Sequence, residues 1–190
     1  LVEKLKKVHA VEIQSIVNPV RPGFSAKGSN LWHGVLYDQA QKRPGEVYVF
    51  SDADIFAAPD TLKKIVARLH QGIDVVGCVP KHIQSKNIWA HFYEVTWNAA
   101  VIYMWASLAQ FNFKSGMAGG TVALRRKDLE KMGGVESFAG YLSEDVQMGQ
   151  QAQKVGLTLG LGPEVFSFVG ELSFSQLWDK FRRGNLALVH

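Results

Sequence analysis

Two carboxylates follow an apolar segment in the first third of the chain. Asp52 and Asp54 stand two residues apart, directly after Val47–Phe50, whose composition is typical of a strand buried on both faces of an α/β sheet. Ligands of such sheets gather at the carboxyl ends of strands. Two carboxylates placed there can share Mg²⁺ or Mn²⁺, which also bind substrate phosphates. The alternative is that Asp52 or Asp54 only turns the chain or caps the next helix.

A second acidic pair, Glu144 and Asp145, follows Ser143 at the start of a segment with helical periodicity. A structural role is one possibility, because acids in the first turn of a helix interact favourably with its dipole, by about 0.3–1 kcal/mol. The other possibility is catalytic, because a carboxylate within hydrogen-bond reach of a hydroxyl in a cleft can act as a general base. The residues alone leave both possibilities open.

Basic side chains stand beside aromatic ones near the C-terminus. Lys180 and Arg183 lie in a segment with helical periodicity, close to Trp178 and Phe181. They form either a solvated basic face or a clamp on a diphosphate, for which arginine supplies forked donors and lysine a point charge.

The elements that must position these residues alternate between strands and helices. The order strand, helix, strand over residues 47–79 is a crossover unit, and it predicts an α/β fold with a largely parallel sheet flanked by helices. Strands are predicted at Val11–Val17, Val47–Phe50, Ile73–Val79, Thr121–Leu124, Leu157–Leu161 and Val165–Val169, and helices at Leu1–His9, Leu31–Gln41, Pro59–Gln71, Ile88–Phe113, Lys127–Met132, Ser143–Val155 and Phe174–Val189.

The predicted helix Ile88–Phe113 is rich in aromatic residues and carries one narrow polar stripe of His91, Glu94 and Asn98. A helix of this kind is usually buried in a core. The alternatives are a helix in a membrane interface and a wall of a lipid-binding groove, where Trp and Tyr are favoured.

The chain has 190 residues, 47% of them hydrophobic and 20% charged, which fits one folded domain with its own core. The single Cys78 excludes a disulfide framework and favours a reducing compartment. The longest apolar run, Ala99–Ala109, is well short of the ~20 residues of a bilayer-spanning helix. The net charge of +4 favours phosphates or anionic lipid as partners. No nucleic-acid partner is expected, because the basic residues are scattered among acidic ones.

Taken in order, four segments resemble the family-2-like glycosyltransferases of GT-A fold, in particular ceramide glucosyltransferase and bacterial lipid glycosyltransferases of hopanoid type. The resemblance implies a GT-A-like mixed, mainly parallel sheet flanked by helices. It also implies that residues 1–190 are a single catalytic domain that is N-terminally truncated, since the first strand and the membrane helices of the family would lie upstream of Leu1. The segments are Gly23–Leu31, Val49–Ile55, Ala118–Thr121 with Arg126–Leu129, and Tyr141–Asp145.

The resemblance also assigns roles to residues. Asp145 matches the catalytic base of these inverting enzymes. Asp52 and Asp54 match the DxD element that binds Mg²⁺ or Mn²⁺, with Asp54 as the main metal ligand and Asp52 nearer the donor sugar or ribose. The remaining positions that match donor-binding residues are Lys27, Asn30, Glu144, Lys180 and Arg183.

The resemblance therefore implies an inverting, metal-dependent transfer of a sugar from a nucleotide-diphosphate sugar to a hydroxyl acceptor, in particular a lipid. It also implies that the parent protein associates with the cytoplasmic face of a membrane. Two departures from the family pattern lie in one element: Lys180 stands at its first position, and Gly184 replaces its tryptophan. Gly184 and the missing first strand favour the alternative that the chain is an inactive GT-A-like remnant that serves as a binding or interaction domain. The intact Asp52, Asp54 and Asp145 favour the enzyme.

Overall fold

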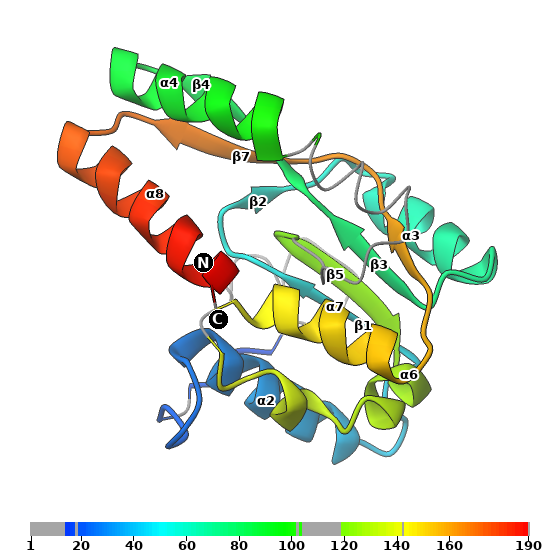
Figure 1. Ribbon diagram of the computed structural model, residues 1–190. Coiled ribbons are helices and arrows are strands. Elements are labelled where there is room, and N and C mark those ends of the chain that lie inside the picture. The colour runs from blue at the N-terminus through cyan, green and yellow to red at the C-terminus, as the bar shows by residue number, and fades with distance from the viewer. Residues whose placement is uncertain (1–13, 18, 102, 104–118, 142, 190) are drawn as a thin grey trace.

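The computed structural model describes residues 14–17, 19–101, 103, 119–141 and 143–189 (Figure 1). Its strands are β1 (Val47–Ser51), β2 (Ile55–Phe56), β3 (Val75–Cys78), β4 (Pro80–Ser85), β5 (Thr121–Arg125), β6 (Leu159–Leu161) and β7 (Val165–Gly170). Its helices are α2 (Ala26–Gln39), α3 (Thr61–His70), α4 (Ile88–Thr96), α6 (Arg126–Lys131), α7 (Glu144–Lys154) and α8 (Phe174–Val189), with a π-helical turn at Trp97–Val101 and a 3₁₀ turn at Val135–Ser137.

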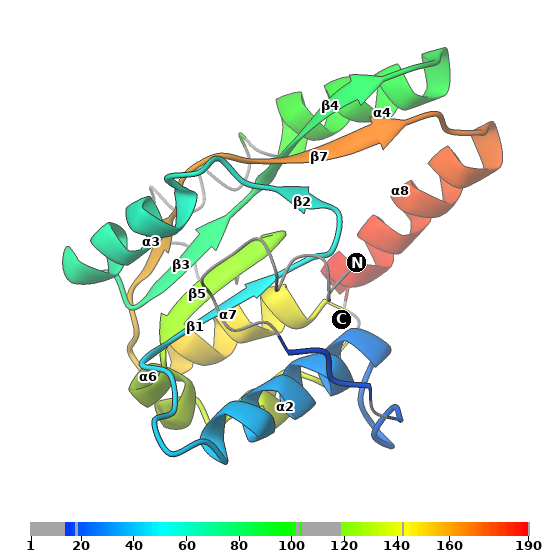
Figure 2. The ribbon, with the colours of Figure 1, turned by 180° about the vertical axis from the view of Figure 1, so that it is seen from behind.

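The larger sheet has the strand order β1-β5-β3-β6. Strands β1, β3 and β6 run in one direction, and β5 lies antiparallel between β1 and β3. The mixed sheet flanked by helices is therefore confirmed. Three of its four strands run in one direction, but only β3 and β6 pair as parallel neighbours. One apolar cluster joins this sheet to α2, α6 and α7, and a second joins it to α3. The sheet thus lies between two helical layers (Figure 1, Figure 2), and its central residues Val75, Val76, Ala123 and Leu124 are fully buried.

A smaller sheet of order β2-β7-β4 extends this core and carries α4 and α8. Here the polar stripe that runs along α4 and into the π-helical turn after it has a structural role. Asn98 exchanges two hydrogen bonds with the backbone of His82, at 3.0 and 2.7 Å, and Glu94 accepts one from the Ser85 N–H at 3.0 Å. These bonds fix α4 to β4. The opposite face of α4 is open to solvent, since Phe92 is 56% exposed, so α4 is not a fully buried core helix.

Several boundaries differ from the sequence-based prediction. Helix α2 begins at Ala26, five residues before the predicted start. Residues 14–17 of the strand predicted at Val11–Val17 belong to no regular element, and strands β2 and β4 were not predicted. The predicted helix over Leu1–His9 and the part of Ile88–Phe113 after residue 103 lie outside the described residues. Among the helices described, none is long and apolar enough to cross a bilayer.

Candidate functional site

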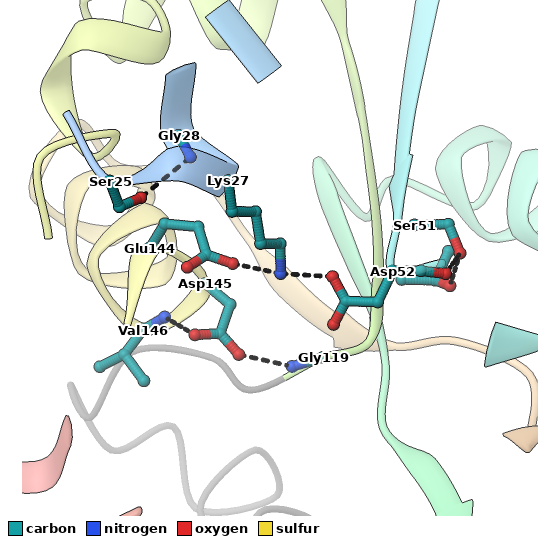
Figure 3. A network of polar contacts seen from close by, with 10 residues as sticks. Ser25, Lys27, Gly28, Ser51, Asp52, Gly119, Glu144, Asp145 and Val146 are labelled. Atoms are coloured by element: carbon teal, nitrogen blue, oxygen red, sulfur yellow. Dashed lines mark hydrogen bonds and ion pairs between the residues drawn. The ribbon is translucent and has the colours of Figure 1, made fainter. Parts of the chain in front are cut away.

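Three segments that are distant in sequence meet at the carboxyl end of β1 (Figure 3). Lys27 comes from the first turn of α2, Asp52 follows β1, and Glu144 is the first residue of α7. The Lys27 Nζ atom lies 2.5 Å from Asp52 Oδ1 and also contacts Glu144 Oε1. One ammonium group thus bridges two carboxylates. The Glu144 side chain is almost buried, and the side chains of Lys27 and Asp52 are partly open to solvent.

The start of α2 sets the position of Lys27. Ser25 caps the helix, because its Oγ accepts a hydrogen bond from the Gly28 N–H at 2.9 Å, and its own N–H donates to the Ala139 carbonyl at 3.0 Å. Gly28 lies directly against that same carbonyl, and a Cβ atom on Gly28 would be 2.1 Å from the Ala139 oxygen. Only glycine fits there, and this close contact holds the first turn of α2 at the site.

Asp145 occupies the first turn of α7, beside the Lys27 bridge (Figure 3). Its Oδ1 accepts a hydrogen bond from the Val146 N–H at 2.8 Å, and its Oδ2 accepts one from the Gly119 N–H at 3.0 Å. Burial raises the pKa of Asp145 to about 6, and the charge of Glu144 adds to this, while the two N–H groups and Lys27 oppose it. A carboxylate whose pKa lies near neutrality is suited to general-base work.

The raised pKa predicts the pH dependence of a reaction in which Asp145 serves as the general base. Only the ionised carboxylate can accept a proton, so we expect kcat/KM to fall as the pH drops through about 6, with a slope of one. The profile would be measured from about pH 4.5 to about pH 8, with a stability control at each value. A rate that stays constant from neutrality down to about pH 5 would contradict the role of Asp145 as base.

The two aspartates after β1 have different partners. Asp52 bonds to Lys27, whereas Asp54 is exposed and its Oδ2 accepts a hydrogen bond from Ser167 Oγ of β7 at 3.2 Å. Within the described residues there is no group of three or more His, Cys, Asp or Glu side chains that could hold a metal ion. Mg²⁺ sites often use one or two carboxylates together with substrate phosphates. Asp54 is open to such a role, and Asp52 is already paired.

The other predicted site residues are less closely grouped. Asn30 lies exposed on α2, one turn after Lys27. Lys180 on α8 places its Nζ 5.0 Å from the centre of the Tyr93 ring of α4. Arg183 belongs to α8, but its side chain lies outside the described part of the structure. The backbone N–H of Gly119 is a site group that the sequence indicated only by the glycine run before β5.

Known proteins were compared with the chain. A model of glycosyl transferase family 21 matches residues 1–187, a span that includes every element contributing to the site. No curated protein matches the sequence.

Proposed function

The chain belongs to glycosyl transferase family 21, and we propose that it transfers a sugar, with inversion, from a nucleotide-diphosphate sugar to the hydroxyl group of a lipid. The family itself implies a glycosyltransferase with a nucleotide-sugar donor and an acceptor. The observation that carries inverting transfer to a hydroxyl group is the position of Asp145: a carboxylate with a pKa near neutrality stands beside the Lys27 bridge, at the carboxyl end of β1.

In the proposed reaction Asp145 takes the proton of the acceptor hydroxyl as the hydroxyl oxygen attacks the anomeric carbon. The bond between that carbon and the diphosphate oxygen breaks, and the electron pair leaves with the diphosphate. The hydrogen bonds from Gly119 and Val146 hold the Asp145 carboxylate in one orientation. Lys27 and Asp52 orient the donor, and Lys180 and Arg183 supply positive charge for the diphosphate.

A divalent cation belongs to this proposal as a ligand of Asp54. Mg²⁺ or Mn²⁺ bound there would neutralise charge on the departing diphosphate. Asp54 is suited to hold it because the side chain is exposed and stands at the end of β1, where substrate phosphates would be within reach.

The aromatic surface formed by α4 and α8 supports a lipid acceptor and association of the protein with a membrane surface. Trp89 and Phe174 bring their rings to 5.2 Å across the two helices, and Trp178 is 63% exposed. Clusters of exposed aromatic side chains mark interaction sites. Aromatic residues beside basic ones, such as Lys180, are typical of helices in a membrane interface.

The proposal is tested by incubating the protein with labelled nucleotide sugars and a lipid extract. We expect a labelled glycolipid whose anomeric configuration is opposite to that of the donor. A product that retains the configuration would overturn the inverting mechanism. A protein that neither transfers the sugar nor hydrolyses any donor would be the inactive remnant, with a binding function in place of catalysis.

Replacing Asp54 with alanine is expected to weaken cation-dependent donor binding about 100-fold, because the proposed ligand of the metal–diphosphate pair is lost. Calorimetric titration with the transferred nucleotide sugar, with and without Mn²⁺, measures this effect. Asp60→Ala is the matched control, since Asp60 is an exposed aspartate at the start of α3. An Asp54→Ala variant with unchanged dependence on Mn²⁺ would contradict the role of Asp54.

A further inference from the structure

In the Lys27 bridge an ammonium group lies between two carboxylates, in the place that a metal ion takes in a carboxylate metal site. Nζ contacts Asp52 from one side and Glu144 from the other (Figure 3). The two carboxylates come from separate elements, the end of β1 and the start of α7, so without a cation between them their charges would repel. Lysine supplies three N–H donors, and two of them are enough for these contacts.

The bridge is held in place by the fold. The backbone that carries Lys27 is fixed by the Ser25 cap and by the contact between Gly28 and Ala139. Glu144 is fixed as the first residue of α7, with its side chain almost buried. The ammonium group of Lys27 contacts both carboxylates, so two negative charges from separate elements stabilise its one positive charge.

We propose that the Lys27 ammonium is the permanent counter-ion of Asp52 and Glu144, and that it excludes a divalent cation from this pair. Asp52 is then a lysine-binding residue and not a metal ligand. A metal ion that arrives with the donor has Asp54 as its protein carboxylate. This last consequence rests on the function proposed above, whereas the exclusion of metal from Asp52 and Glu144 does not.

Geometry favours this assignment over a metal ion that displaces lysine. Mg²⁺ requires a nearly octahedral set of oxygen atoms and gives up its water reluctantly. Asp52 and Asp54 have different partners, since Asp52 contacts Lys27 and Asp54 accepts a hydrogen bond from Ser167 on β7. Displacing Lys27 would also leave an ammonium group without its two carboxylate partners in a partly buried site, which is unfavourable.

The test removes the ammonium and asks whether a metal ion replaces it. Mn²⁺ binding is followed by electron paramagnetic resonance without any donor, so the result does not depend on transfer activity. We expect Lys27→Met to bind Mn²⁺ about tenfold or more tightly than the natural protein, and Lys27→Met combined with Asp52→Asn to lose this gain. Lys64→Met removes an exposed lysine paired with Asp60, and this control should show no gain.

Two results would overturn the proposal. One is a folded Lys27→Met variant that binds Mn²⁺ no better than the natural protein. The other is loss of Mn²⁺ binding in the single variant Asp52→Asn, which would show that Asp52 already ligates the metal in the natural protein. This variant tests the proposal even where Lys27→Met does not fold. Unchanged Mn²⁺ binding in Asp52→Asn supports the proposal.

Discussion

Asp145→Asn is expected to lower kcat for sugar transfer about 10³-fold or more and to change the dissociation constant of the donor less than about threefold. The amide keeps the size of the side chain and can still accept a hydrogen bond from Gly119 or Val146, but it cannot take a proton from the acceptor. The loss therefore belongs to the chemical step. Single-turnover transfer, combined with calorimetric titration of the donor, separates the two quantities.

The stability of the same variant gives an independent check. The pKa of Asp145 is about 6 in the folded protein and 3.8 in its unperturbed state. Folding therefore disfavours the ionised form, and the contribution of this group to stability is full below about pH 4 and is lost as the pH rises through about 6. Asparagine never ionises, so Asp145→Asn should raise the free energy of unfolding above pH 6, by up to about 3 kcal/mol.

Chemical denaturation at about pH 8 and at about pH 4 measures this difference, which should shrink at the lower value. Asp60→Asn changes an exposed aspartate at the start of α3 and serves as the control for both experiments. Transfer within about tenfold of the natural rate in Asp145→Asn would overturn the assignment of the base. A variant less stable at pH 8 than the natural protein would contradict the raised pKa.

The sequence predicted those parts of the site that depend on residues adjacent along the chain. Asp52 follows a strand whose apolar composition is unmistakable, and Asp145 lies in the first turn of a helix with clear periodicity, so both were placed at the ends of the correct elements. The larger sheet needed more than local pattern. Strand β5 inserts antiparallel between β1 and β3, and such long-range pairing leaves no mark in the periodicity of any single strand.

The missed elements have a related cause. Strand β4 carries polar residues and begins with Pro80, so its composition does not indicate a strand. It is stabilised by parallel pairing with β7 and by hydrogen bonds between its backbone and the side chains of Asn98 and Glu94, of which the Glu94 carboxylate only accepts. These same two side chains suggested a polar stripe on a core or membrane helix, because a sequence does not show that the backbone groups they bind lie across from them.

The start of α2 shows which part of the site could not be predicted from the sequence alone. Gly28 and the nearby Gly23 and Pro22 made residues 18–30 resemble a loop, so the helix was predicted to begin at Leu31. The glycine at position 28 has another reason, which is the Ala139 carbonyl pressed against it from a segment more than a hundred residues away. Lys27 could be connected with the site only through the family resemblance, and its bridging contacts emerged from the folded structure.

Gly28→Ala is expected to be the most damaging substitution outside the reacting groups. The new methyl group would lie 2.1 Å from the Ala139 oxygen, and that oxygen is backbone and cannot rotate away. The first turn of α2 must then shift and move Lys27 away from Asp52 and Glu144. Overpacking of this kind costs about 1–3 kcal/mol of stability, and a displacement of about 1 Å at a site can reduce activity about 100-fold.

Gly34→Ala in the same helix is the matched control, and its expected effect on stability is the opposite of that of Gly28→Ala. Gly34 is exposed, and a Cβ atom there meets nothing within 4 Å, so alanine should stabilise α2 by about 0.5–1 kcal/mol. Thermal unfolding resolves both changes, at about 2–4 °C per kcal/mol for a chain of this size. If the Gly28→Ala variant were as stable and as active as the Gly34→Ala variant, the contact of Gly28 with Ala139 would not matter for folding or activity. The explanation of how α2 holds Lys27 at the site would then be wrong. A Gly28→Ala variant that unfolds at lower temperature while Gly34→Ala unfolds at higher temperature would tie the position of Lys27 to a single backbone contact.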